Sequence, residues 1–124
     1  MKRLVFRPLF VFAFALLWLG GSWRICAQSN GVLRESYSGI NGTAVSDLTN
    51  NPAFPNNPTT VTVITNFFEA PINVADNYGQ RMSGYLVPPT TGSYLFWVSS
   101  DDNSILALST DDNSANKRVI ASVP

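Results

Sequence analysis

The chain has 124 residues, enough for one domain of modest size, and its eight Lys and Arg residues balance eight Asp and Glu residues. It contains no histidine, which excludes Ser-His-Asp catalysis, Cys-His catalysis and the usual histidine-ligated zinc sites within this chain. A hydrolase that uses a carboxylate pair stays chemically possible, because it requires only two Asp or Glu side chains.

The first 27 residues predict a signal peptide. Basic residues at positions 2, 3 and 7 precede the apolar run PLFVFAFALLWLGG, which is shorter than the roughly 20 residues of a membrane span. Ala27 is a small residue that suits cleavage after it, and cleavage after Ser22 is the alternative. We expect residues 1–27 to be removed and residues 28–124 to be secreted or displayed at a cell surface, with no transmembrane anchor.

Removal of this segment changes the charge of the chain. Four of the eight basic residues leave and all the acidic residues stay, so residues 28–124 carry a formal net charge of −4. Nucleic acid and anionic membrane surfaces are poor partners for such an acidic domain. The only cysteine, Cys26, leaves as well, so the mature domain has no disulfide and depends on core burial or a bound ion.

The mature chain shows a period-two pattern and no convincing helical stretch. Short runs rich in β-branched or aromatic residues occupy residues 31–39, 60–68, 83–88, 93–100, 105–110 and 117–123. Turn signals separate them at residues 41–42, 49–60, 77–79 and 88–92. Several short strands without intervening helices predict an all-β fold, an antiparallel β-sandwich or jelly roll.

The aromatic residues of these runs are expected mainly in the core. In the run 93–100, Tyr94 and Phe96 share one face and Trp97 lies on the other, which predicts an internal strand covered on both sides. Tyr85, Phe96 and Trp97 also suit stacking against a sugar if they are exposed. Phe54 is the candidate anchor of the Asn- and Pro-rich loop at residues 49–60.

The sequence Asp-Asp-Asn-Ser occurs twice, at residues 101–104 and 111–114. The pair Asp101 and Asp102 directly follows the most hydrophobic predicted strand, where two like charges are costly unless they are solvated or neutralised. One interpretation is a solvated hairpin turn, for which Asp, Asn and Ser are favoured residues. The other is a calcium site, because calcium binds six to eight oxygen ligands, many of them carboxylates.

The second pair, Asp111 and Asp112, favours the turn interpretation. It follows the run 105–110, whose six residues span roughly 20 Å if they form a straight strand. Calcium–oxygen distances are about 2.3–2.6 Å, so both pairs cannot bind the same ion. We therefore expect the two copies at opposite ends of a sheet.

The segment from Asn73 to Pro124 resembles a known family. The stretch Gly84 to Trp97, GYLVPPTTGSYLFW, followed by Asp101 and Asp102, is similar to the most recognisable part of the PA-fourteen domain. This lectin-like β-sandwich module occurs in anthrax protective antigen, yeast flocculins and adhesins, and bacterial glycosidases. The opening at residues 31–58, GVLRESYSGINGTAVSDLTNNPAFPNNP, also resembles the start of the domain.

The resemblance implies a site at the first aspartate pair. In sugar-binding members of the family, the matching aspartates are calcium ligands joined by a cis peptide bond, and the calcium accepts vicinal hydroxyls of a sugar. Carried onto this chain, the calcium ligands and sugar-binding residues are Asp101 and Asp102. Residues 28–124 resemble roughly the first two-thirds of the module, and the family's further ligands come from a later loop.

These observations predict a non-catalytic, calcium-assisted module that binds a glycan or polysaccharide. The alternative is an adhesion or assembly module that binds protein partners at the cell surface, in which the aspartates only shape a turn. A catalytic role based on the carboxylates is a third hypothesis, tested by glycoside hydrolysis that is lost in Asp101→Asn.

Overall fold

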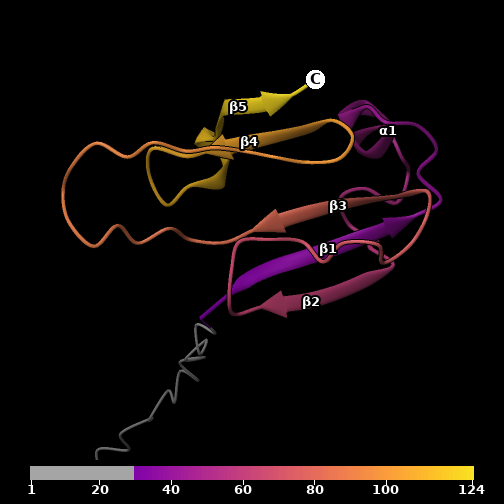
Figure 1. Cartoon of the computed structure of the whole chain (residues 1–124), viewed down its shortest axis with the longest axis horizontal. Helices are drawn as coiled ribbons and strands as arrows, with labels where there is room; N and C mark the ends of the chain where they lie inside the picture. Colours follow the sequence, from indigo (N-terminus) through magenta and orange to yellow (C-terminus); the bar gives the residue numbers. More distant parts are fainter. Residues whose placement is uncertain (1–29) are drawn as a thin grey trace, which may run out of the picture.

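The computed structural model describes residues 30–124, so the predicted signal peptide at residues 1–27 lies outside the described part. The elements of this part, in chain order (Figure 1), are β1 (Val32–Ser38), α1 (Val45–Thr49), β2 (Thr60–Ile64), β3 (Tyr78–Ser83), β4 (Ser104–Leu108), the 3-10 helix η1 (Ser114–Asn116) and β5 (Arg118–Val123). The strands at 32–38, 60–64, 104–108 and 118–123 confirm four of the predicted runs.

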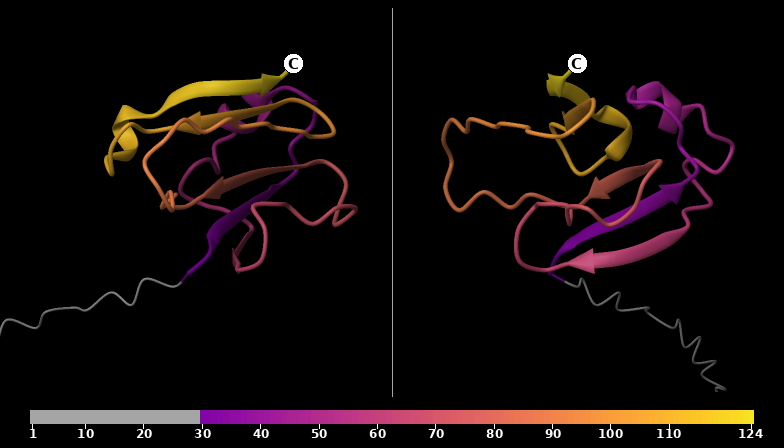
Figure 2. Two further views of the ribbon diagram at one scale, coloured as in Figure 1. Left: turned by 60° about the vertical axis from the view of Figure 1, so that its left-hand side comes forward. Right: turned by 45° about the vertical axis from the view of Figure 1, so that its right-hand side comes forward.

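The strands form two antiparallel sheets. The first has the order β2-β1-β3, and the second pairs β4 with β5 through a register shift between Leu106 and Ala107. The second sheet lies on the β3 side of the first, as Figures 1 and 2 show from three directions. The predicted all-β antiparallel fold is confirmed.

The buried centre of the described residues lies on β1 and the chain just after it. Tyr37 is fully buried and Ile40 is 5% exposed. The ring of Phe54 packs against Tyr37 at 5.4 Å between centroids, and the Tyr37 hydroxyl donates a hydrogen bond to the Pro55 carbonyl (3.0 Å). Phe54 therefore anchors the Asn- and Pro-rich loop, as the sequence predicts.

A buried ion pair joins two neighbouring strands. Glu35 is 7% exposed and accepts two hydrogen bonds from Arg81, at 2.5 Å from Nε and 2.8 Å from Nη2. The guanidinium also lies 5.3 Å from the centroid of the Phe54 ring. The hydrogen bond to Glu35 raises the pKa of Arg81 above its ordinary value. Sequence reasoning missed this pair, because the two residues lie 46 positions apart.

The third strand occupies a different segment from the one that the sequence predicts. Residues 77–79 are predicted as a turn and 83–88 as a strand, but β3 spans Tyr78–Ser83. The turn ends at Asn77, which has a φ of 51° in the left-handed region, and Tyr78 then pairs with Ser38. Register with β1 therefore overrides the local turn signal.

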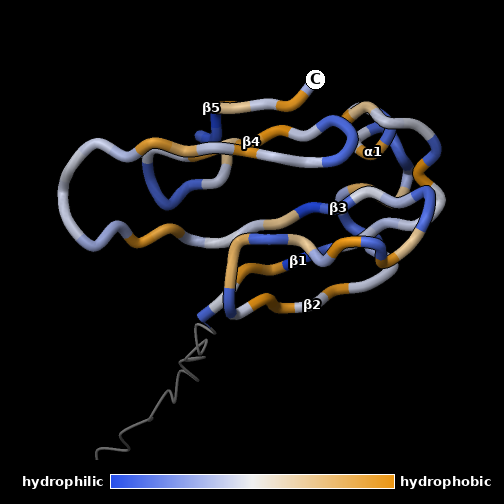
Figure 3. The backbone as a smooth tube through the Cα atoms, in the orientation of Figure 1, coloured by the Kyte–Doolittle hydropathy of each residue, from blue (hydrophilic) through white to orange (hydrophobic). Residues whose placement is uncertain are grey.

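The run 93–100 is extended but pairs with no strand in the described part of the chain. The prediction of an internal strand covered on both sides is wrong here. Tyr85 is 74% exposed and Trp97 is 79% exposed, so the expected core position is also wrong for both, whereas Phe96 is half-buried. Figure 3 shows hydrophobic stretches on both arms of the long connection between β3 and β4. A strand forms only where a partner lies alongside it, and that partner is not visible in the local pattern.

The sequence predicts no helix, but the structure contains the short helix α1. In α1, Asp47 accepts a hydrogen bond through Oδ2 from the Ala44 backbone N–H (2.9 Å), which caps the first turn. Nowhere in residues 30–124 is there a helix with the length and apolar character that a membrane crossing requires.

Candidate functional site

The two aspartate pairs lie at opposite ends of β4. Asp101 and Asp102 precede β4 on the side of α1, and Asp111 and Asp112 follow it on the side of η1 (Figure 1). The structure thus confirms that the two copies belong to different ends of a sheet. They also differ in the hydrogen bonds that their carboxylates make.

We call residues 100–104 the aspartate turn. The Ser100 hydroxyl donates to the Asp102 carbonyl (2.7 Å), and it lies 2.7 Å from the hydroxyl oxygen of Ser104. Asp101 Oδ1 accepts a hydrogen bond from the Asp102 backbone N–H (3.1 Å). These bonds hold the main chain of the turn and leave most carboxylate oxygens free.

One main-chain hydrogen bond joins the aspartate turn to the loop between β1 and α1. The Asn103 backbone N–H donates to the Thr43 carbonyl at 3.1 Å. Among residues 30–124, this is the only hydrogen bond between the part after β3 and the part that ends with β3. The contact places the aspartates beside the loop that leads into α1.

The cis peptide bond that the family resemblance implies between the aspartates is not found. The one cis peptide bond in residues 30–124 joins Phe54 to Pro55. The chain instead reverses because Asp102 has a φ of 61°, in the left-handed region. Asp and Asn enter this region more readily than other non-glycine residues, since their short polar side chains can bond locally.

Both carboxylates of the aspartate turn are available to a ligand. They are exposed, and neither forms an ion pair with any residue from 30 to 124. Carboxylate oxygens are ligands that calcium prefers, so the donor chemistry fits that ion. The described residues bring no third carboxylate or thiol close enough to complete a cluster. Within residues 30–124, a cation at this turn would therefore take its remaining ligands from carbonyl, water or bound-ligand oxygens.

The second copy is an internally bonded turn. Asp111 Oδ1 accepts from the Asn113 backbone N–H (2.9 Å) and the Ser109 hydroxyl (3.1 Å), and Oδ2 accepts from the Asn116 amide (2.7 Å). Asn113 in turn caps η1 by accepting from the Ala115 N–H (3.0 Å). The carboxylate of Asp111 is therefore used within the turn.

The same contacts stabilise the charged form of Asp111. The hydrogen bond from the Asn116 side chain, followed by that from the Asn113 backbone, lowers the pKa of Asp111 below its ordinary value. The structure thus supports the turn interpretation that the sequence favours for this copy.

A second polar region was not anticipated from the sequence. An open hollow lies between the chain that follows β1 and the face of α1, and several asparagine side chains line it. The consecutive residues Asn50 and Asn51 are visible in the sequence, but they read only as part of a solvated loop. Nothing local indicates that Ile40 and Asn41 lie opposite them.

Comparison with known protein families identifies the domain to which most of the described residues belong. The model of the PA14 domain, the PA-fourteen family named above, matches residues 28–116. The chain belongs to the PA14 domain family. PA14 domains are non-catalytic modules of a carbohydrate-binding or adhesion type, and they occur in extracellular or surface proteins.

One curated relative is the mouse (Mus musculus) N-acetyl-beta-glucosaminyl-glycoprotein 4-beta-N-acetylgalactosaminyltransferase 1. It is 39% identical to this chain over 82 residues, which cover 66% of the chain and 8% of the relative. The PA14 chain described here thus spans a small part of that enzyme's length. No solved structure matches the chain.

Proposed function

We propose that this PA14 domain is a calcium-assisted carbohydrate-binding module in which Asp101 and Asp102 are the metal ligands. The observation that carries the proposal is the contrast between the two aspartate pairs. Asp101 and Asp102 are exposed, adjacent and free of ion pairs, whereas the Asp111 carboxylate accepts three hydrogen bonds within its own turn.

The chemistry of the proposed site follows from its donors. The two carboxylates supply hard, charged oxygens, and the bonds of Ser100 and Asn103 fix the main chain that carries them. A calcium ion there would be coordinated by hydroxyl oxygens of a sugar. Asp101 and Asp102, which are exposed, would hold it.

Thermal unfolding with calcium and with chelator tests the metal site. Calcium that binds the folded state stabilises it by about 2.7 kcal/mol at a hundredfold excess over Kd. We expect this shift to disappear in Asp101→Ala/Asp102→Ala and to persist in Asp111→Ala/Asp112→Ala, which is the matched control.

Two results contradict the metal site. One is loss of the calcium shift in the Asp111 and Asp112 variant but not in the Asp101 and Asp102 variant. The other is the absence of any shift at millimolar calcium in the unmutated protein. Retention on polysaccharide resins, with and without chelator, then tests whether the bound ion supports glycan binding.

A second candidate function is supported by the exposed apolar side chains. Tyr85, Leu95 and Trp97 are all largely exposed on the connection between β3 and β4. Large exposed apolar side chains are more frequent at protein-binding surfaces than elsewhere on a soluble domain, so an adhesion or assembly module that binds cell-surface proteins is the alternative. Binding to the resin that does not depend on calcium or on the aspartates favours this alternative.

We further propose that the module itself is non-catalytic and exported. The non-catalytic role follows the family, and export follows the basic and apolar start of the chain, which lies outside the described residues. Detectable glycoside hydrolysis by the protein that is lost in Asp101→Asn contradicts the first statement. A mature N-terminus at residue 28, determined by mass spectrometry of the exported protein, tests the second.

A further inference from the structure

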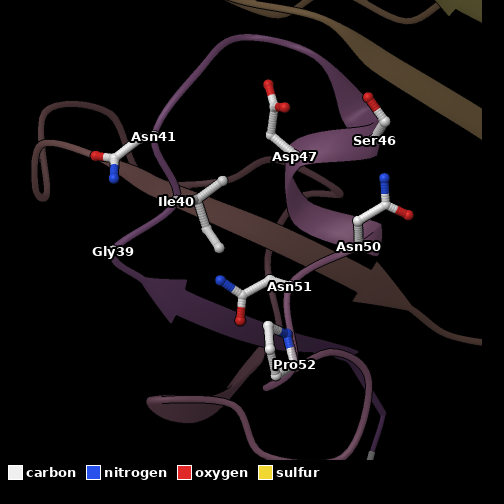
Figure 4. Close-up of a pocket in the computed structure, with 8 residues that line it drawn as sticks. All are labelled: Gly39, Ile40, Asn41, Ser46, Asp47, Asn50, Asn51 and Pro52. Atoms are coloured by element: carbon white, nitrogen blue, oxygen red, sulfur yellow. The ribbon is translucent and has the colours of Figure 1, made fainter.

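The hollow beside α1 has a lining made mostly of uncharged polar groups. We call it the amide hollow; its volume is about 350 Å³, and it is lined by Gly39, Ile40, Asn41, Ser46, Asp47, Asn50, Asn51 and Pro52. Figure 4 shows Ile40 at its centre, Asn41 on one side, and Asn50 and Ser46 on the α1 side. The volume is at the lower end of the range for small-ligand sites.

Several polar groups of the amide hollow keep free hydrogen-bonding capacity. The side chains of Asn41, Ser46 and Asn50 make no hydrogen bond with any residue from 30 to 124. Asn51 uses its Oδ1 to accept from the Ala53 N–H (2.9 Å), which leaves its amide donors free. The hollow therefore presents both donors and acceptors to a ligand.

The two walls of the amide hollow are held in place by the main chain. On one wall, the Ile40 N–H donates to the Asn77 carbonyl (2.9 Å). On the other, the Asn50 N–H donates to the Ser46 carbonyl (2.9 Å), and the Asn51 N–H donates to the Leu48 carbonyl (3.0 Å). Because the lining is already fixed, less conformational entropy of the protein is lost when a ligand binds.

The composition of the lining selects a class of ligand. Amide and hydroxyl groups match a neutral polyhydroxyl compound, because each sugar hydroxyl both donates and accepts hydrogen bonds. Pro52 adds an exposed apolar surface for the C–H face of a sugar ring, whereas Ile40 is buried and adds little. The lining contains no Lys or Arg, and its one charge is the Asp47 carboxylate, so phosphate and sulfate groups are disfavoured.

We propose that the amide hollow is a second, metal-independent subsite for a neutral saccharide unit. The choice of a saccharide rests on the proposed function. The hydrogen bond from the Asn103 N–H to the Thr43 carbonyl joins the aspartate turn to the loop that begins at Asn41. The aspartate turn and the amide hollow are therefore neighbours. One glycan chain thus contacts the aspartate turn with one unit and the amide hollow with another.

The test is an NMR titration of the full, ¹⁵N-labelled chain with methyl α-mannopyranoside, methyl β-galactopyranoside and N-acetylglucosamine. Each sugar is added once with millimolar calcium and once with chelator, and glycerol serves as the control polyol. We expect at least one sugar, and not glycerol, to shift the backbone signals of residues 46–51 in both conditions. Asn50→Ala should weaken that binding about fivefold, the equivalent of about one hydrogen bond, and Asn56→Ala in the neighbouring loop should not.

The outcomes separate this subsite from the proposed function. Shifts confined to residues 100–104 overturn the amide hollow and leave the calcium site standing. Shifts at residues 46–51 that persist in Asp101→Ala/Asp102→Ala, in a protein that calcium does not stabilise, support the hollow while the metal site fails. Absence of shifts at residues 46–51 with all three sugars, or equal shifts with glycerol, overturns the inference.

Discussion

Glu35 is the one carboxylate that is buried among residues 30–124, and its charge is matched by a single side chain. The two hydrogen bonds from Arg81 orient that guanidinium under the Phe54 ring, so the same residue also supports the Asn- and Pro-rich loop. A buried carboxylate that loses its partner keeps the cost of leaving water without the compensating attraction. Arg81 is therefore the most sensitive polar position in the described part of the chain.

Arg81→Ala should lower the free energy of unfolding by about 3 kcal/mol, the low end of the range for a broken buried pair, because Arg81 itself is partly exposed. Urea unfolding measures this change. Lys117→Ala removes an exposed cation and should change the stability by less than about 0.5 kcal/mol. Equal effects of the two substitutions contradict the role assigned to the pair.

Asn116→Ala should raise the pKa of Asp111 toward its ordinary value, because it removes the largest of the contacts that stabilise the carboxylate. The contribution of this turn to stability is present above the unfolded-state pKa of an aspartate, about 3.9, and is lost as the pH falls through the lower folded-state pKa. NMR titration of the Asp111 carboxyl carbon measures the shift. An unchanged pKa in Asn116→Ala contradicts the assignment.

The turn before α1 depends on glycine at residue 42. Gly42 has a φ of 115°, and a Cβ atom placed there lies only 2.3 Å from Asp47 Oδ2, the atom that caps α1. Gly39 has a φ of 73° with nothing within 4 Å of the same position. The chain can therefore approach Asp47 closely only without a side chain at residue 42.

Gly42→Ala should cost about 2–3 kcal/mol, since backbone strain and the contact with Asp47 act together. Gly39→Ala introduces backbone strain but no close contact, so it should lower the free energy of unfolding by about 1 kcal/mol. Gly92→Ala, at an open position without a positive φ, is the control and should change stability by no more than about 0.5 kcal/mol. The order of the three values, measured by thermal or urea unfolding, is the test.

At the scale of elements, the sequence predicts what depends on local pattern. β1, β2 and β5 lie within the predicted runs, and β4 begins one residue before its run, because their β-branched and apolar residues alternate. β3 was missed because Asn77 to Gly79 carries a turn signal, whereas its strand character comes from pairing with β1. The candidate sites differ in the same way. The aspartate pairs can be recognised in the sequence, but the proximity of Ile40 and Asn50 depends on the fold and cannot.

At the scale of the whole molecule, much apolar surface stays in contact with solvent. β2 forms one edge of its sheet, and its Val61 and Val63 side chains are about half exposed or more (55% and 50%). The connection between β3 and β4 adds exposed aromatic and aliphatic side chains. Uncharged edge strands and apolar patches of this kind favour association between chains.

The protein comprising residues 28–124 should therefore give a low soluble yield or self-associate, as sedimentation velocity will measure. Val63→Lys places a charge on the β2 edge and should shift the distribution toward monomer. Asn56→Lys adds the same charge in a loop away from that edge and should not. A cooperative, monomeric unfolding transition of the unmutated protein contradicts this prediction.

The single hydrogen bond from the Asn103 N–H to the Thr43 carbonyl makes that amide a reporter on the whole molecule. Its exchange with deuterium requires that bond to open, so the exchange rate follows separation of the second sheet from the loop before α1. Amides within β1 exchange only when their own sheet opens, and they provide an internal reference. Slower exchange at Asn103 alone, after a ligand is added, then distinguishes closure between the two sheets from general stabilisation of the fold.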